Sequence, residues 1–564
     1  MRASLLLCSV AFVFGCGPSD RDLGPCNPGD HQCNGLELLE CINGQYQHSM
    51  DCPQACSPMV GCALCVPGTG TCSGDMAHTC NADGSGYDDI YCDPVQGESC
   101  DTTAGACVGD CSPKTLGNSY IGCEYYPTVT GNTTGTVFDF AVAIANTTAN
   151  PAMVTIDGGA LTSTQMVMVA PNSVVVQTLP WVPALKLCDQ PNTDGCQTVP
   201  AGALATKGAY HLRSTSPITV YQFNSLEYEK NSEFSYSNDA SLLLPTNVWR
   251  TKYFAAGWVP LNSGGVVIYP DELAVSAAQD NTSVTITTTA AAGGVGGAPS
   301  FMAGAANMVS LNAGDVVELA ASTGDLTGSL IDSDRPVQVI SGHYCAYVPN
   351  NVTACDHLEE SMFPVDTLGT HYIVSAPAVT SIPNGKAEVI RIIATAPNTT
   401  LTFDPPQTGA GTTIANAGGF VEISSNNQNF QITADQKVLV AQYMEGEEAG
   451  GGTGDPAMTL AVPVEQFRAS YLFHAPTSYE SNYVDVTAPM GATVSLDGGA
   501  PLTFTAIGTS GYGLARVQAL GAGPANDGNH NIQGDQGFGI TVYGYGQYTS
   551  YWYPGGLNLE SILE

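Results

Sequence analysis

The chain has 564 residues, too many for a single hydrophobic core, so several domains are expected. Charged residues make up only 12 %, whereas glycine (63) and proline (35) are abundant, a composition that favours short strands and turns over long helices. The formal net charge of −36 repels phosphate backbones, which excludes nucleic acid as an expected partner. Alternatively, the charge only keeps an exported protein soluble.

Residues 1–15 have the features of a lipoprotein signal peptide. Arg2 precedes an apolar run that is too short to span a bilayer. The run ends in Val13-Phe14-Gly15-Cys16, which resembles the lipobox of lipoprotein signal peptidase, and this resemblance implies lipidation of Cys16. An ordinary secretory signal with a chance cysteine is the alternative. We therefore expect a bacterial envelope protein, at the outer membrane or cell surface, attached by lipid alone through a tether of residues 16–25.

Residues 26–110 contain a cysteine repeat, in which a second set of six cysteines follows the first in the same order. The first three cysteines recur at one constant shift, and the fourth recurs with one extra position. Modules of this size bury too little apolar surface to fold alone, so disulfides are expected to stabilise them. Zinc is a weaker alternative because only one CxxC pair is present, and the spacing does not choose among the possible pairings. The two sets are Cys26, Cys33, Cys41, Cys52, Cys56, Cys62 and Cys65, Cys72, Cys80, Cys92, Cys100, Cys107.

One stretch of the second module has the look of a calcium loop. It runs from Asn81 through Asp83 to Asp88 and is rich in glycine and aspartate. Its counterpart in the first module, Asn43-Gly-Gln-Tyr46, reads as an ordinary turn, so we predict a turn here too.

Residues 111–556 are predicted to be all-β, with four internal repeats. Three connectors share a proline followed at a fixed interval by a tyrosine, and the strand late in each repeat begins with a small polar turn. Each repeat has the size of a β-sandwich rather than a propeller blade, so the predicted fold is tandem sandwich-like units behind small disulfide-rich modules. Residues 557–564 are predicted to be a C-terminal tail. The repeats begin near Tyr120, Tyr253, Tyr372 and Tyr471, and the late strands near Pro217, Pro336, Lys437 and Gly537.

The β region also resembles a known family. The residues that carry the resemblance are Tyr221-Gln-Phe-Asn224, Ser237 to Pro245, Gly342-His-Tyr-Cys345, Cys355 to Glu360, Gly454 to Gln466 and Tyr551 to Gly556. In this order they are similar to the N-terminal domain of IgGFc-binding proteins, over roughly residues 111–556. The resemblance implies a binding role. This chain has the lipobox and cysteine modules where the animal proteins have von Willebrand-type D modules.

No catalytic motif appears in a supporting context. We find no nucleophile elbow, Walker loop, HExxH or dinucleotide-binding glycines. Acidic clusters at Glu227 to Glu233 and at Glu445, Glu447 and Glu448 suit a glycosidase, but such pairs arise freely among 51 acidic residues. We therefore expect that the protein is not an enzyme.

Cys345 and Cys355 are the cysteines of the second repeat and are predicted to form a disulfide across a hairpin. Strand alternation about that bond would place His343 opposite His357 on one face, with Glu359 beside them. Two histidines and a carboxylate can hold a transition metal, but a structural hydrogen-bonding role is the preferred interpretation. Cys188 and Cys196 are predicted to form another disulfide. No cofactor is otherwise expected.

Taken together, these features predict a cell-surface binding or adhesion protein that recognises an extracellular protein or glycan through the loops of the β region. A surface polysaccharide hydrolase and a purely structural envelope protein are the alternatives.

Overall fold

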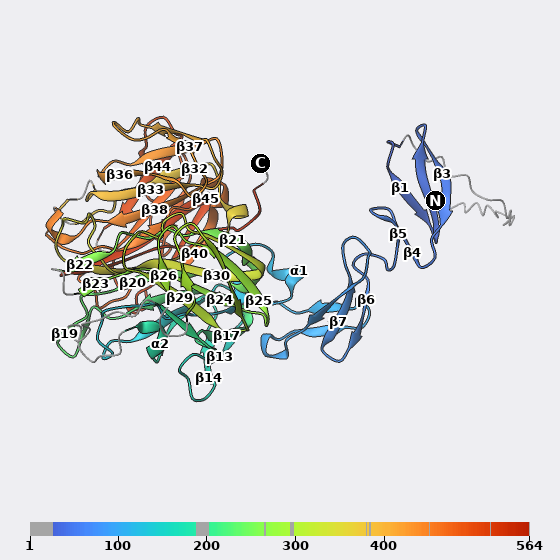
Figure 1. Ribbon diagram of the computed structural model, residues 1–564, viewed down its shortest axis with the longest axis horizontal. Coiled ribbons are helices and arrows are strands. Elements are labelled where there is room, and N and C mark those ends of the chain that lie inside the picture. Colours follow the sequence, from blue (N-terminus) through green and yellow to red (C-terminus); the bar gives the residue numbers. More distant parts are fainter. Residues whose placement is uncertain are drawn as a thin grey trace, which may run out of the picture. The chain divides into compact units, whose positions relative to one another are not determined.

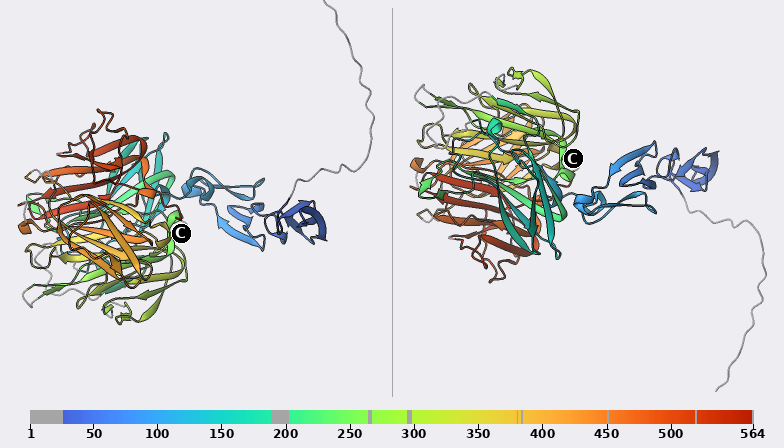
Figure 2. Two further views of the ribbon diagram at one scale, coloured as in Figure 1. Left: turned by 90° about the horizontal axis from the view of Figure 1, so that it is seen from above. Right: turned by 90° about the horizontal axis from the view of Figure 1, so that it is seen from below.

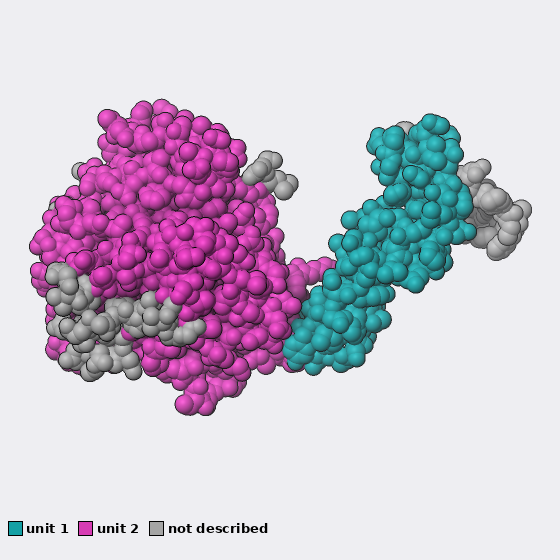
Figure 3. All heavy atoms as spheres, in the orientation of Figure 1, with its two compact units in different colours: residues 1–92, 99–108 teal, residues 93–98, 109–564 magenta. Residues whose placement is uncertain are grey.

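The computed structural model describes residues 26–562, except 188–201, 264–266, 294–297, 380, 383–384, 450–451 and 519. The chain divides into two compact units, one ending at residue 92 with 99–108 added, the other comprising 93–98 and 109–564 (Figure 3). The predicted signal peptide, tether and Cys16 lie outside the described residues. Within the described ranges, no helix is both long and apolar enough to cross a bilayer.

The first unit consists of two modules with the same strand order. Each has a three-stranded antiparallel sheet followed by a two-stranded hairpin. The first comprises β1 (His31–Asn34), β2 (Glu37–Ile42), β3 (Gln45–Asp51), β4 (Ala55–Ser57) and β5 (Gly61–Ala63). The second comprises β6 (Gly70–Ser73), β7 (Met76–Cys80), β8 (Tyr87–Tyr91), β9 (Ser99–Asp101) and β10 (Ala106–Val108).

The predicted disulfides of the modules are present, with the same connectivity in both. The first cysteine bonds the third, the second bonds the fifth, and the fourth bonds the sixth. Because sulfur bonds replace most of the missing core, neither module needs a large apolar cluster. The bonds are Cys26–Cys41, Cys33–Cys56 and Cys52–Cys62, then Cys65–Cys80, Cys72–Cys100 and Cys92–Cys107.

The second unit is all-β, as predicted (Figure 1). Four successive segments within it follow one pairing pattern. Each segment has a long strand. A first and a third strand flank the first half of this long strand, and a second strand and a closing strand flank its second half. In the first segment these strands are β11 (Gly122–Tyr125), β12 (Phe140–Asn146), β13 (Ala152–Gly158), the long β17 (Tyr210–Asn224) and the closing β20 (Asp239–Leu243).

The other segments repeat the pattern with their own strands. The second has β21 (Arg250–Phe254), β24 (Asp271–Ala277), β25 (Thr282–Thr287), long β30 (Leu330–Ala346) and closing β31 (Asp356–Ser361). The third has β32 (His371–Val374), β33 (Glu388–Ala394), β34 (Thr399–Asp404), β37 (Phe430–Ala434) with β38 (Val438–Met444) as the long strand, and closing β39 (Met458–Leu460). The fourth has β40 (Arg468–His474), β41 (Ser481–Pro489), β42 (Val494–Leu496), long β45 (Asn529–Gly546) and closing β46 (Thr549–Pro554).

Shorter elements complete the sheets. The outer strands are β14 (Gln165–Val169), β15 (Ser173–Leu179), β16 (Gly202–Ala205), β28 (Ala306–Leu311), β29 (Val316–Ala321), β35 (Thr413–Ile414), β36 (Phe420–Asn426), β43 (Thr505–Ala506) and β44 (Tyr512–Val517). Small hairpins are β18 (Glu229–Lys230) with β19 (Glu233–Phe234), β22 (Leu261–Ser263) with β23 (Val267–Tyr269), and β26 (Ala292–Gly293) with β27 (Ser300–Phe301). The helices are single turns, including α1 (Pro113–Leu116) and α2 (Pro183–Lys186).

One tyrosine in each first strand joins that strand to the long strand. Its hydroxyl accepts a hydrogen bond from the backbone N–H three positions earlier and donates to a carbonyl of the long strand. In the first segment this residue is Tyr125 rather than the predicted landmark Tyr120. The donor, tyrosine and acceptor are Gly122, Tyr125 and Ile218; Arg250, Tyr253 and Val337; Gly369, Tyr372 and Val438; and Arg468, Tyr471 and Phe538.

The predicted polar turn before each late strand is, in three segments, a bulge inside one continuous strand. The pairing of β11 with β17 shifts register between Gly122 and Glu124, and β21 with β30 and β40 with β45 shift in the same way. At the bulge in β17, the Ser214 hydroxyl donates to the Ser216 carbonyl. This local bond satisfies the backbone without a turn. In the third segment alone, the strand divides into β37 and β38.

The four segments share a centre rather than following one another as separate sandwiches. The closing strands touch in cyclic order, β20 beside β31, β31 beside β39, β39 beside β46, and β46 beside β20. One apolar cluster includes a valine from the second strand of every segment, Val142, Val275, Val389 and Val486.

The four segments thus form a ring around the closing strands. The ring closes where the beginning of the β region (cyan) and its end (red) lie side by side (Figure 2). Tyr120 N–H donates to the Leu557 carbonyl and Leu559 N–H donates to the Asn118 carbonyl, both over 3.1 Å. Leu557 and Leu559 are fully buried. The predicted tail is therefore, through residue 562, part of the fold, because its leucines fill the seam.

Candidate functional site

The closing strands present their inner edges to the centre of the ring, where no further strand pairs with them among the described residues. The backbone N–H groups of these inner edges need an acceptor, and the side chain of Asp239 supplies it. Its carboxylate accepts the N–H of Ala240 at 2.9 Å on its own strand, of Glu359 at 3.1 Å, of Met458 at 2.9 Å and of Trp552 at 3.0 Å. One side chain thereby joins all four closing strands, since an ionised carboxylate has acceptor sites for about four donors.

Two more buried carboxylates, both on β31, also accept backbone N–H groups near the centre. Asp356 accepts the N–H groups of Asn238 (2.6 Å), His357 (2.8 Å) and Ser550 (3.0 Å). Glu360 accepts those of Leu242 (3.1 Å) and Ser361 (3.0 Å). Burial raises the pKa of Asp239, Asp356 and Glu360 well above the ordinary value, and the N–H donors oppose that rise. We name Asp239, Asp356 and Glu360 the central carboxylates.

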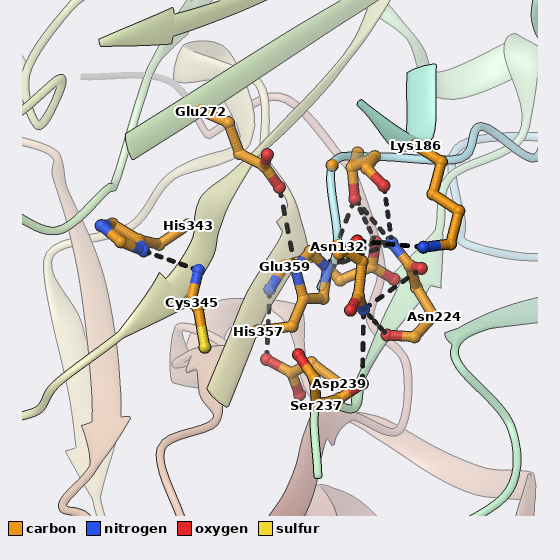
Figure 4. Close-up of polar contacts among 12 residues, drawn as sticks. Asn132, Lys186, Asn224, Ser237, Asp239, Glu272, His343, Cys345, His357 and Glu359 are labelled. Atoms are coloured by element: carbon orange, nitrogen blue, oxygen red, sulfur yellow. Dashed lines mark hydrogen bonds and ion pairs between the residues drawn. The ribbon is translucent and has the colours of Figure 1, made fainter. Parts of the chain in front are cut away.

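The expected placement of His343 opposite His357 is wrong. In the ladder of β30 and β31, His343 pairs with Leu358 and Gly342 pairs with Glu359. The register shifts between His343 and Ala346, so the symmetric hairpin assumed from the cysteines is off by a single position. Such a slip moves a side chain to the other face, and Figure 4 shows His343 pointing away from His357 and Glu359.

Glu359 lies inside a cage of neutral donors. Thr130 Oγ1 donates to it over 3.0 Å, Gln222 Nε2 over 3.1 Å and Ser241 Oγ over 3.2 Å. Asn224 Nδ2 donates over 3.3 Å (Figure 4). All these side chains are buried. The carboxylate is thus held for structure, because its oxygens are occupied and no solvent-borne ligand reaches them.

Beside this cage lie two carboxyls of the second segment. Glu318 accepts the N–H of Gly131 over 2.8 Å, and Glu272 Oε1 lies 3.8 Å from His357 Nδ1. Burial, reinforced by Glu318, raises the pKa of Glu272 well above its usual range, and burial does the same for the pKa of Glu318. A raised pKa makes these carboxyls weaker metal ligands, because metal binding requires the ionised form.

The described residues contain no group of three or more His, Cys, Asp or Glu side chains placed to hold a metal ion. The expected transition-metal set of His343, His357 and Glu359 is thus not assembled. The glycine-rich stretch of the second module forms the predicted turn, in which Gly84 N–H donates to the Asn81 carbonyl and Ser85 N–H to Asp83.

Cys345 and Cys355 are bonded, with Cα atoms 5.1 Å apart. The bond closes the connector between β30 and β31. A further bond, Cys111–Cys123, lies at the start of the β region. Cys188 and Cys196 lie outside the described residues.

The exposed counterpart of the buried centre is formed by the four connectors that lead from the long strands to the closing strands. Their described residues are 225–238, 347–355, 445–449 with 452–457, and 547–548. Each is hydrogen-bonded to another connector or to the closing strand that follows one. Gly446 N–H donates to the Val348 carbonyl and Gln547 N–H donates to Tyr228 Oη, which join two pairs of connectors directly. Asn238 N–H donates to Asp356 of β31, and Asp455 N–H donates to Ser550 Oγ of β46. We call the surface made by these connectors the connector face.

Both acidic clusters seen in the sequence lie on the connector face. Burial raises the pKa of Asp455, in the third connector, to about 7, and it lowers the pKa of Lys386, which precedes β33, to about 8. Lys386 Nζ donates to the Thr453 carbonyl over 3.1 Å. This cation holds the third connector in place and is not available to a ligand.

Sequence reasoning missed the aromatic residues of this face. Tyr236 and Tyr548 are 41 % and 40 % exposed, although both belong to connectors anchored in the core. Both have left-handed backbone, with φ of 49° and 57°. The available signal was aromatic residues within polar turn sequences, but exposure could not be read from it.

The fold and its connector face define a class, an all-β repeat protein with a loop-built surface suited to binding. A family model described as IgGFc binding protein matches residues 239–544, more than half of the chain, and the protein belongs to this family. The resemblance inferred from the sequence is thereby confirmed. The human IgGFc-binding protein is 27 % identical over 256 residues, which cover 44 % of this chain and 4 % of that protein. The chain therefore matches only a small part of its relative's length.

Proposed function

We propose that the protein is a surface-exposed binding protein that recognises a protein partner through the connector face. The observation that carries the proposal is that the four connectors lie at the same end of the long strands, each fixed by a hydrogen bond to another connector or to the closing strand that follows one. Loops held by a rigid scaffold are the common location of binding residues. Membership of a family named for binding supports recognition rather than catalysis.

The test is binding by the full chain after one connector is altered. Replacement of the β18–β19 hairpin by a short Gly-Ser turn should abolish capture of the partner from a panel of purified extracellular proteins, with human Fc among them. A matched replacement of the turn at residues 406–411, outside the connectors, should leave capture intact. Capture that survives loss of the hairpin and of the other connectors contradicts the proposal.

We also propose that lipid on Cys16 anchors the chain at the cell envelope. The support is the short apolar run that ends at a small residue and a cysteine. Metabolic labelling with a palmitate analogue should mark the wild-type protein and not Cys16→Ser. Retained labelling of that variant contradicts the anchor.

A further inference from the structure

A run of aromatic rings leads from the core to the connector face. Ring centroids are separated by 6.0 Å between Tyr479 and Tyr228, 5.1 Å between Tyr228 and Phe234, 5.7 Å between Phe234 and Tyr236, and 6.2 Å between Tyr236 and Tyr548. The first two rings are buried, Phe234 is partly buried and the last two are exposed. The exposed pair is thus backed by fixed rings, an arrangement that keeps the loss of side-chain entropy on binding small.

A surface hollow of about 250 Å³ adjoins these rings. Its lining includes Tyr479, Glu480, Asn482 and Leu520. The hollow has apolar walls from Tyr479 and Leu520 and a carboxylate from Glu480, and its volume far exceeds the roughly 30 Å³ taken by one water. An extended side chain with a charged end fits such a lining.

One buried hydroxyl separates the hollow from the exposed rings. Tyr228 Oη donates to Glu480 Oε1 over 3.3 Å and accepts the Gln547 N–H over 3.1 Å. Burial raises the pKa of Tyr228 to about 12, so the hydroxyl keeps its proton at neutral pH. Glu480 is therefore held beside the connector that carries Tyr548, and the hollow and the rings form one surface.

The charge of this surface is negative. Glu229, Glu233 and Glu480 are exposed around it. Lys230, the cation of the same hairpin, is engaged by Asp139 at 2.7 Å and Glu227 at 3.2 Å. The nearby carboxylates are thus not neutralised by that lysine, and the chain as a whole carries −36.

We infer that this surface binds a protein segment that contains arginine or lysine. The aliphatic stem lies in the hollow against Tyr479 and Leu520, the cationic end meets Glu480, and the adjacent residue packs on Tyr236 and Tyr548. Aromatic faces and carboxylates both attract cations, whereas an anionic ligand would be repelled. The inference rests on the proposed function, because it assumes a protein ligand, and it adds the chemistry of that ligand.

The test uses the full chain and a fluorescein-labelled tetra-arginine peptide, with fluorescence polarisation at about 0.15 M salt. Glu480→Gln should weaken binding by about fivefold, the effect of roughly 1 kcal/mol. Asp332→Asn removes the same charge from an exposed site on β30 and should change affinity less than twofold. The double variant Tyr236→Asn with Tyr548→Asn suits the left-handed backbone and should weaken binding at least as much, while Tyr87→Ser in the modules should not.

Equal losses in Glu480→Gln and Asp332→Asn would mean non-specific attraction and would overturn the inference. A neutral glycan that binds through the tyrosines and ignores Glu480 would overturn it in favour of a carbohydrate ligand. If the chain captures a protein partner through other connectors and these variants leave capture unchanged, the inference fails while the proposed function stands. Matching melting temperatures for all variants show that folding is not the cause.

Discussion

In the first disulfide module the buried apolar cluster is Leu38 with Cys52 and Cys56, whereas one cluster of the β region includes residues from all four segments. The module replaces burial with three covalent bonds in the short stretch from Cys26 to Cys62. The β region instead closes on itself and must provide acceptors for four inner strand edges. The contrast shows two routes to stability. The small modules gain it from disulfides, which lower the conformational entropy of the unfolded chain. The closed β region must instead provide hydrogen-bond acceptors for the backbone N–H groups that it buries at its centre.

Reduction of the disulfides in the full chain should show the difference between the modules and the β region most clearly. We expect the two modules to unfold, because their cores are too small, while the β region stays folded despite losing Cys111–Cys123 and Cys345–Cys355 at roughly 2–3 kcal/mol each. Limited proteolysis with mass spectrometry, with and without reductant, measures both parts in one sample. Cleavage throughout residues 109–562 under reduction would contradict the expectation.

Removing the acceptor at the centre should have the next largest effect. Asp239→Ala leaves four N–H groups without their carboxylate, at about 1–3 kcal/mol for each unsatisfied group, partly offset by relief of the buried charge. We expect a loss of at least about 3 kcal/mol in the free energy of unfolding by chemical denaturation. Asp239→Asn, which keeps one acceptor oxygen, should lose less, and Asp332→Asn should lose almost nothing. A loss below about 1 kcal/mol for the alanine variant would show that the carboxylate does not hold the centre.

Burial of Asp455 in the third connector should make the free energy of unfolding depend on pH. The pKa of Asp455 is raised from its ordinary value to about 7, so the folded state binds more protons than the unfolded state between about pH 4 and 7. Stability therefore falls as pH rises through that window, by up to about 1.4 kcal/mol per pH unit from this group. Asp455→Asn keeps the oxygen that accepts the Glu447 N–H and should remove that share of the slope. Unfolding curves at several pH values test this, and identical slopes in both proteins would contradict it.

The smallest expected effect concerns the first strands. Tyr253→Phe removes a buried hydroxyl that accepts the Arg250 N–H and donates to the Val337 carbonyl. Loss of these bonds should cost about 1–2 kcal/mol, measured by chemical denaturation. Tyr87→Phe in the modules is the control, because that side chain is 55 % exposed. Equal stabilities would show that this hydroxyl, although repeated in every segment, contributes little.

Much of the architecture could be predicted from the sequence because it depends on local spacing. The cysteine repeat and the tyrosines after Pro245, Pro364 and Pro463 recur at fixed intervals, and turn chemistry keeps those intervals. Tyr125 was missed because Tyr120 fits the local motif equally well. The difference appears only in the hydrogen bond from the Tyr125 hydroxyl to the Ile218 carbonyl, 93 residues away.

The centre and the connector face could not be predicted in the same way. Asp239 bonds the backbone N–H groups of Met458 and Trp552, which lie 219 and 313 residues away in the sequence, and such partners leave no local pattern. The prediction for His343 was wrong because the pairing register shifts by one position beside the disulfide. Strand alternation alone does not predict such a shift. Residue type likewise did not show that Tyr236 would be exposed while Tyr228 is buried.

The seam between residues 118–120 and 557–559 bears on how the β region is made. The first segment receives its last backbone partners from residues 557–559, which are synthesised after all four segments. Until they arrive, the edge at Tyr120 lacks its partner, and any protease or chaperone meets an open ring. Once closed, the ring has no privileged starting point, and a chain begun at another junction between segments, with residues 118 and 559 joined by a short linker, should reach the same structure.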